Sequence, residues 1–197
     1  MSVKQLLREW YPVEYTPGLI KESRDKNDGK LMLSGIIQKS NTQNQNKRIY
    51  PSEILRREVE NYQKAVRENR AVGELDHPES SSVSLDRVSH VLREMWWDGD
   101  NVMGRVEVLD TPKGQILQSL LESGITIGIS SRGVGSTEKS NEGLDMVQGD
   151  YQIICFDIVS EPSTPGAYLF AEGKMIERPK FNRADRIFRA LNDIVRK

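Results

Sequence analysis

The sequence predicts an α+β fold in which an antiparallel β-sheet or barrel is flanked by helices. Two observations carry this prediction: hairpin signals dominate the middle of the chain, and helical stripes separate groups of strands. A regular alternation of single strands and helices would instead predict a doubly wound parallel sheet. The predicted strands span residues 31–38, 72–77, 83–97, 102–108, 125–130 and 151–159.

The helix predicted between the first two strands begins at Pro51, because the missing N–H of proline costs no hydrogen bond in a first helical turn. It follows an exposed, amide-rich loop at residues 41–47 and ends near Arg70. Its apolar stripe, spaced four, three and four residues apart, consists of Leu55, Val59, Tyr62 and Val66.

The centre of the chain carries a hairpin turn signal, Asp-Gly-Asp-Asn, at residues 98–101. The strand before the turn is long enough to hold a bulge, and apolar and polar residues alternate after it, which predicts a half-buried strand. Thr111 then caps a second helix, with Pro112 at its first position and Gly124 at its C-terminal cap. The inner stripe of this helix consists of Ile116, Leu117, Leu120 and Leu121.

The last third of the chain combines two strands with a final helix. The first strand is predicted to break at Ser130 into a turn of small residues that extends to 135. Asn182 can cap a final amphipathic helix, which we expect to dock on its own domain or on another subunit. The chain thus divides into an N-terminal arm at 1–30, a main domain at 31–175 and a C-terminal amphipathic helix at 176–197.

The composition limits the classes of function. The 197 residues are 37% hydrophobic and 29% charged with a net charge of −1, so nothing favours a nucleic-acid partner. No apolar run approaches the roughly 18 residues of a membrane span, and the charged N-terminus is unlike a secretory signal. The single cysteine, Cys155, excludes an intramolecular disulfide and suits a reducing cytoplasm.

Only two histidines can act as a general base, His77 and His90. His77 lies between a short strand and a loop, where catalytic groups often occur, although a solvated turn histidine shows the same pattern. His90 lies inside a strand pattern, which is typical of a structurally satisfied residue. No metal or cofactor site is predicted, because the sequence lacks paired histidines or cysteines at ligand spacing and a complete phosphate-binding glycine loop.

The segment at 128–135 can carry a nucleophile. A serine hydroxyl needs a neighbouring base and nearby N–H groups that hold the oxyanion. Ser130 follows a buried strand and precedes glycines that allow tight backbone turns, and Arg132 adds a positive charge. An ordinary Gly-Ser loop shows the same pattern, so this segment alone leaves both interpretations open.

Together, these segments resemble the myovirus-type prohead core protein proteases, which belong to the wider group that shares the herpesvirus assemblin fold. The matching motifs, in family order, are NKRIYP at 46–51, GELDHP at 73–78, MWW at 95–97, GISSRG at 128–133, and Asp157 followed by Pro162-Ser163. The resemblance implies a helix-decorated antiparallel β-barrel. It also implies that residues 31–175 form a serine endopeptidase domain.

The resemblance assigns Ser130 as the nucleophile and His77 as its base. Ser131 is the alternative nucleophile, and only one of the two serines can meet His77, because adjacent strand residues point to opposite faces. Asp157 is the preferred third member, which would orient His77 and stabilise its protonated form. Asp76 and His90 are the alternatives for this role.

The same resemblance implies that backbone N–H groups around Arg132 and Gly133 hold the oxyanion, with Ser131 supporting the site. The expected substrates are phage scaffold, core and capsid proteins, cleaved after Leu/Ile-x-Glu inside the prohead in the host cytoplasm. We expect a homo-oligomer with no nucleic acid, membrane or cofactor partner. Two such triplets in the arm, Leu7-Arg8-Glu9 and Ile20-Lys21-Glu22, predict self-trimming. The alternatives are a catalytically silent core or scaffold protein with the same fold, and an esterase that uses the same serine.

Overall fold

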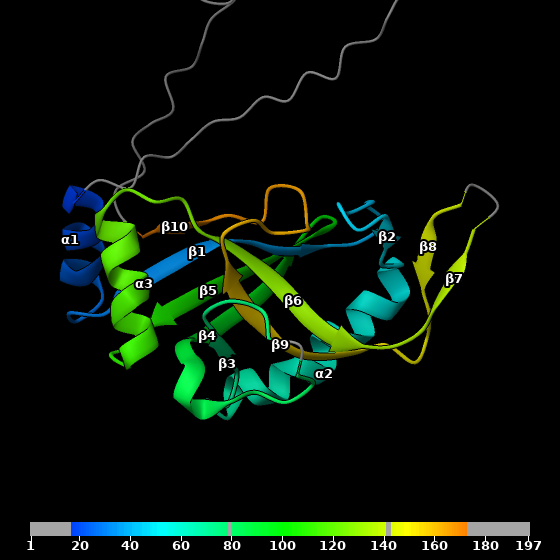
Figure 1. The fold of residues 1–197 in the computed structure, drawn as a ribbon, viewed down its shortest axis with the longest axis horizontal. Helices are drawn as coiled ribbons and strands as arrows, with labels where there is room; N and C mark the ends of the chain where they lie inside the picture. The colour runs from blue at the N-terminus through cyan, green and yellow to red at the C-terminus, as the bar shows by residue number, and fades with distance from the viewer. Residues whose placement is uncertain (1–16, 79, 141–142, 173–197) are drawn as a thin grey trace, which may run out of the picture.

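The protein, described by a computed structural model over residues 17–78, 80–140 and 143–172, is built on a five-stranded sheet. The sheet has the order β10-β1-β5-β4-β3 (Figure 1). All neighbouring strands in it are antiparallel. Its strands are β1 (Leu31–Lys39), β3 (Val72–Glu74), β4 (Val88–Asp98), β5 (Asn101–Val108) and β10 (Leu169–Ala171).

The remaining described strands form two smaller sheets. β6 (Gly128–Val134) and β9 (Gln152–Val159) form an antiparallel ribbon that crosses the five-stranded sheet (Figure 1). The third sheet consists of β2 (Arg48–Ile49), β8 (Asp145–Val147) and β7 (Thr137–Lys139), with β2 parallel to β8.

The predicted α+β class with mostly antiparallel pairing is confirmed. The described strands nevertheless form three separate sheets and not a closed barrel. The physical reason is that β6 and β9 pair with each other, and only isolated bridges, Leu75 to Ile158 and Gly128 to Tyr168, connect this ribbon to neighbouring segments.

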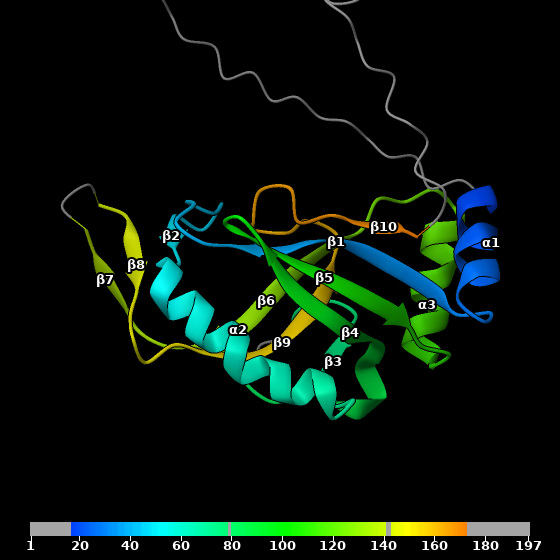
Figure 2. The same cartoon turned by 180° about the vertical axis from the view of Figure 1, so that it is seen from behind.

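One helix packs between the ribbon and the main sheet, and two others pack at one end of the molecule. α2 (Ser52–Arg67) packs against β4 and β9 and crosses the face seen in Figure 2. Its buried side chains include the whole predicted stripe of Leu55, Val59, Tyr62 and Val66. α3 (Pro112–Glu122) begins as predicted, because the Thr111 side chain accepts the Gly114 N–H at 3.0 Å. Ile116, which was expected in the inner stripe of α3, is exposed.

The central hairpin also follows the prediction. β4 ends at Asp98 and β5 begins at Asn101, so the turn lies where the sequence places it. A register shift between Leu92 and Glu94 is the expected bulge. The alternating pattern in β5 correctly predicts its buried face, which includes Val102 and Val106.

β6 differs from the prediction of a turn that begins at Ser130. The strand continues unbroken to Val134, because pairing with β9 keeps this backbone extended. The small residues serve close packing instead of a turn: a Cβ atom on Gly133 would lie 2.5 Å from the Cε2 atom of Tyr151. Ser130 therefore lies inside a strand with a fixed facing direction.

Part of the expected N-terminal arm is a docked helix, α1 (Pro17–Lys26), which contacts β1, β10 and α3. Ile20 is 2% exposed, and the Ser23 hydroxyl donates to the Met32 carbonyl at 2.9 Å. The Leu7-Arg8-Glu9 triplet and the helix predicted at 176–197 lie outside the described residues. None of the described helices is both long and apolar enough to cross a membrane.

Candidate active site

The β6–β9 ribbon places Ser130 directly opposite Asp157 in its register. Directly opposed residues of an antiparallel pair project their side chains from the same face, so the hydroxyl and the carboxylate lie on one side of the ribbon. Ser130 is 5% exposed and Asp157 is fully buried. The sequence could not predict this pairing, because the two residues lie on strands separated by a long connection.

His77 reaches the same carboxylate from the loop that follows β3. Its Nδ1 atom lies 2.8 Å from Oδ2 of Asp157, so the ring donates this N–H to the ionised carboxylate and keeps Nε2 available to a hydroxyl. The His77 side chain is 37% exposed, in contrast to the buried aspartate, which leaves the ring accessible to a substrate. Among the described residues, the Ser130 hydroxyl does not hydrogen-bond to His77, a contact that commonly tightens only in a substrate complex.

Asp76 fixes the backbone at His77 and does not contact its ring. Asp76 adopts a left-handed conformation with φ of 73° and donates its backbone N–H to the Ile158 carbonyl at 2.7 Å. Its carboxylate accepts the backbone N–H of His77 at 3.0 Å. The loop is thus anchored to β9 one residue beyond Asp157, which supports Asp157 and not Asp76 as the partner of the ring.

β3 must lie very close to β9 for His77 to reach Asp157, and Gly73 permits this approach. A Cβ atom on Gly73 would lie 2.0 Å from the Phe156 carbonyl oxygen and 2.4 Å from Nε2 of His90. Glu74 then donates its backbone N–H to Oδ1 of Asp157 at 3.0 Å. Neither contribution was predicted from the sequence, because both depend on the close approach of β3 to β9.

The Asp157 carboxylate is ionised despite its burial. Burial alone would raise its pKa, but hydrogen bonds from His77 and from the Glu74 backbone and the positive charge of Arg132 outweigh that effect and hold the pKa below its usual value. The Cys155 thiol donates to Oδ1 at 3.3 Å, and burial together with the nearby Asp157 charge raises the pKa of the thiol to about 12. An anionic Asp157 is the state that can stabilise a protonated His77.

His90, the other histidine, has a structural role. Its Nε2 atom donates to the Phe156 carbonyl at 3.0 Å, and Nδ1 accepts the Ser89 hydroxyl at 2.9 Å. Complete burial lowers the pKa of His90 to about 4, so the ring is neutral near pH 7. The sequence interpretation of His90 as a satisfied strand residue agrees with these contacts.

Ser131 points to the face opposite Ser130. The Gln38 amide donates to the Ser131 hydroxyl oxygen at 2.6 Å, and the Gln38 carbonyl oxygen accepts the Thr164 hydroxyl at 2.7 Å. Gln38 is itself 2% exposed, so this network belongs to the packed interior. Of the two adjacent serines, Ser130 is the one on the face of Asp157.

The main-chain directions along β6 bear on the expected oxyanion donors. Ile129 donates its N–H to the Ala167 carbonyl at 2.9 Å, away from β9. Because N–H directions alternate along a strand, the Ser131 N–H points away from β9 and the Arg132 N–H faces it. The Arg132 guanidinium contacts the Asp157 carboxylate instead of projecting toward solvent. Gly133 is exposed and follows a register shift in the ribbon.

Within the described residues, no group of three or more His, Cys, Asp or Glu side chains is placed to hold a metal ion. The side chains that gather here are a serine, a histidine and a buried aspartate. A hydroxyl, an imidazole and an anionic carboxylate are the three groups that serine hydrolases use for acyl transfer. The site therefore has the chemical composition of a serine hydrolase.

Comparisons with known proteins agree with this class. The chain matches the family described as prohead core protein serine protease over residues 16–177. It is 34% identical over 180 residues to the prohead core protein protease of Enterobacteria phage T4, a match that covers 86% of this chain and 85% of that protein. The solved structure of the bacteriophage T4 capsid assembly protease aligns with a TM-score of 0.65 and 32% identity, covering 68% of this chain and 84% of that chain. The chain belongs to the prohead core protein serine protease family, and it is a hydrolase of peptide bonds.

Proposed function

We propose that this protein matures a phage prohead by cleaving core, scaffold and capsid proteins, with Ser130 as the nucleophile and His77 as the base. The observation that carries the assignment is the 2.8 Å contact between His77 Nδ1 and Asp157 Oδ2 on the strand pair where Ser130 opposes Asp157. No other described histidine is available, because both ring nitrogens of His90 are occupied in the interior.

In the proposed reaction, the Ser130 hydroxyl attacks the scissile carbonyl while Nε2 of His77 accepts its proton. His77 then returns the proton to the leaving amine, and water hydrolyses the acyl-enzyme by the same steps in reverse order. Asp157 holds the ring through Nδ1 and stabilises the imidazolium that forms during each step. The Asp157 carboxylate is ionised at neutral pH and can act in this way, because its pKa lies below its usual value.

The oxyanion requires N–H donors that no strand partner occupies. The sequence-based proposal places them around Arg132 and Gly133, with Ser131 in support. The alternation of N–H directions along β6 favours the Ser131 N–H over that of Arg132, and Gly133 remains the second candidate. Ser131 would then contribute its main chain to catalysis and its side chain to the Gln38 contact.

We also propose cleavage after Leu/Ile-x-Glu, including self-trimming of the N-terminal arm. Of the two triplets in residues 1–30, Ile20-Lys21-Glu22 lies inside α1, where Ile20 is buried. A protease binds its substrate in an extended conformation, so cleavage at Glu22 would require α1 to unfold. Trimming after Glu9 requires no such unfolding of α1, and Glu9 is therefore the proposed site.

The remaining proposals concern context. The domain proposed for catalysis spans residues 31–175 as a relative of the herpesvirus assemblin fold, with residues 1–30 as an arm and residues 176–197 as an amphipathic helix. We propose that the protein acts as a homo-oligomer inside the prohead in the host cytoplasm, without nucleic acid, membrane or cofactor partners. Membership of a protease family supports the catalytic function over that of a silent scaffold.

One experiment separates the three candidate functions. The purified protein is incubated with a peptide ending in Leu-x-Glu before the scissile bond, with a control peptide in which Gln replaces that Glu, and with a small activated ester. A protease with the proposed specificity cleaves the first peptide well and the second poorly. Turnover of the ester alone would indicate an esterase. The same substrates are also given to assembled proheads that contain the protein, and turnover of neither peptide nor ester there would indicate a silent scaffold.

A further inference from the structure

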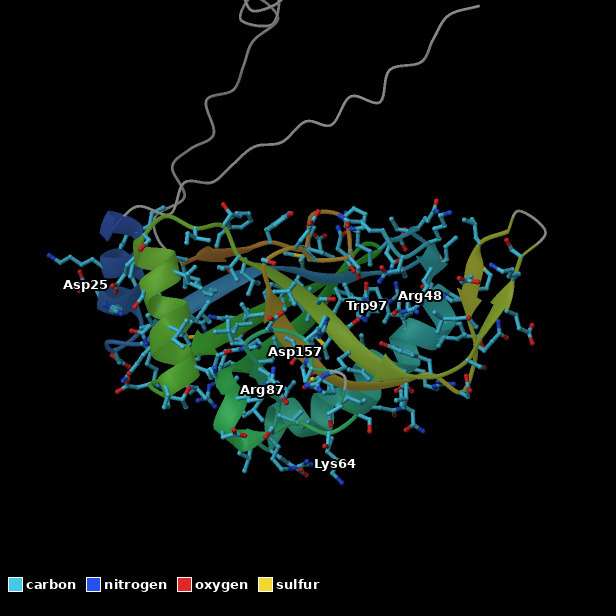
Figure 3. The ribbon with its side chains drawn as sticks, viewed as in Figure 1. Asp25, Arg48, Lys64, Arg87, Trp97 and Asp157 are labelled. Carbon is cyan, nitrogen blue, oxygen red and sulfur yellow. The ribbon has the colours of Figure 1, made fainter. Side chains whose placement is uncertain are left out.

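A network of buried charges lies behind the proposed triad and has no assigned role. Its centre is the guanidinium of Arg132, which is 9% exposed and lies between two fully buried carboxylates, Asp157 and Glu74. Arg132 Nε lies 2.9 Å from Asp157 Oδ2, and Nη2 lies 3.2 Å from Glu74 Oε1. Arg87 contacts the other side of Glu74, with 3.3 Å between Nε and Oε2. Asp157 and Arg87 are labelled near the centre of Figure 3.

The same guanidinium also holds the loop that follows His77. Its Nη1 atom donates to the carbonyl oxygens of Ser80 at 2.7 Å and Ser82 at 3.3 Å. Glu74 holds the far end of this loop, because its Oε1 atom accepts the Ser84 N–H at 2.7 Å. Arg132 therefore connects three parts of the site: the strand of the nucleophile, the carboxylate that binds the base, and the loop that carries the base.

Charge balance explains why both carboxylates are needed. A buried ion pair is stable only when each charge has partners, and removing one partner leaves an uncompensated charge. Because the Arg132 guanidinium lies between two carboxylates, its positive charge compensates both Asp157 and Glu74. Glu74 thus offsets part of the positive charge of Arg132, so Arg132 neutralises the Asp157 anion less completely and Asp157 favours a protonated His77 more strongly.

We propose that Arg132 and Glu74 are positioning residues that set the basicity of His77 through Asp157 and hold its loop in place. This inference rests on the proposed Ser130–His77–Asp157 triad. It gives the Arg132 side chain a role behind the triad, distinct from the oxyanion role expected from the sequence.

Few other groups near Asp157 change charge between pH 5 and pH 9. The facing titratable or charged groups come from each surrounding element: Tyr62 on α2, Glu74 on β3, His77 on the following loop, His90 on β4, Arg132 on β6 and Cys155 on β9. Burial raises the pKa of Tyr62 and of Cys155, and it lowers that of His90 to about 4. Tyr62, Cys155 and His90 therefore keep their charge states between pH 5 and pH 9.

The chain provides a direct readout, because its 197 residues include only two histidines. We would follow both imidazole rings by NMR between pH 4.5 and pH 9 in full-length Ser130→Ala protein, which the proposed triad predicts not to process itself. In this background, Arg132→Gln should move the His77 midpoint to higher pH, and Glu74→Gln should move it to lower pH. Each shift is expected to be about half a pH unit or more, a threefold change in proton affinity.

A matched control pair lies on the surface, where Glu68 and Arg70 contact each other with partly exposed side chains. Glu68→Gln and Arg70→Gln should leave the His77 midpoint unchanged. Midpoints that stay in place, or that move in the same direction in both network variants, would overturn the proposal. If Arg132→Gln fails to fold, two variants decide the question. Arg132→Lys should preserve the His77 midpoint, and Glu74→Gln must still lower it.

Activity measurements separate this proposal from that of the triad. These measurements use protein that retains Ser130. Arg132→Lys keeps the positive charge but loses the guanidinium contacts to Ser80 and Ser82, so kcat should fall while the acid limb of the pH profile stays in place. Glu74→Gln should move the acid limb to lower pH. If Ser130→Ala still cleaves substrate, the proposed triad is wrong whatever the midpoints show, whereas an inactive Ser130→Ala with unmoved midpoints overturns only the positioning role.

Discussion

The buried ring of His90 makes the fold sensitive to acid in a defined pH range. Complete burial lowers the pKa of His90 to about 4 from an ordinary value of 6.5. As pH falls from about 6.5 to about 4, the unfolded chain binds a proton that the folded chain does not, so stability is lost through this window. The difference corresponds to about 3 kcal/mol of unfolding free energy, at 1.36 kcal/mol for each pKa unit.

The assay is urea unfolding of Ser130→Ala protein, which the proposed triad predicts to be inactive, with and without His90→Gln, at several pH values between 7 and 4. The Gln amide can still donate to the Phe156 carbonyl, and it does not titrate. The protein with His90 should lose about 3 kcal/mol more over this range than the protein with Gln. Asp157 does not confound the comparison, because it is present in both proteins; since its pKa lies below the usual 3.8, most of its own contribution is lost below this window. Parallel losses in the two proteins would refute the reasoning.

Three further predictions concern the site and the arm. Asp157→Asn should lower kcat for peptide cleavage by about 10⁴-fold, as loss of the carboxylate does in other triads, while circular dichroism remains native; a loss below tenfold would argue against its role. Gly73→Ala should destabilise the protein by about 1–3 kcal/mol in urea unfolding, because its Cβ would overlap the Phe156 carbonyl, whereas Gly149→Ala, with no atom within 4 Å of the new Cβ, should change stability little. Glu22→Gln should leave the position of self-trimming unchanged, and mass spectrometry that shows trimming abolished would place the cleavage site in α1.

The elements that the sequence predicts well are those specified by local signals. The stripe of α2, the Thr111 cap and the turn between β4 and β5 each depend on residues a few positions apart. Local patterning fixes such features because it selects both the backbone conformation and the buried face. Motif resemblance added the positions of His77 and Ser130, which composition and spacing alone leave ambiguous.

The features that the sequence could not predict depend on long-range pairing. The run of small residues after Ser130 has the composition of a turn, yet pairing with β9 keeps it extended. The ion pairs of Arg132 were also inaccessible to the sequence, because its carboxylate partners lie 58 and 25 positions away in the chain, at Glu74 and Asp157. Their juxtaposition results from the close approach of β3 to β9, which a single sequence does not encode in any local pattern.

The most direct test of the central assignment compares Ser130→Ala with Ser131→Ala. Each variant and the unmodified protein would be incubated with the cognate scaffold protein in assembled proheads, and the intact masses of all products would be measured. We predict defined cleavages after Leu/Ile-x-Glu with the unmodified protein and with Ser131→Ala, and none with Ser130→Ala. Undiminished cleavage by Ser130→Ala, or its loss only in a folded Ser131→Ala, would contradict the assignment of Ser130 as the nucleophile.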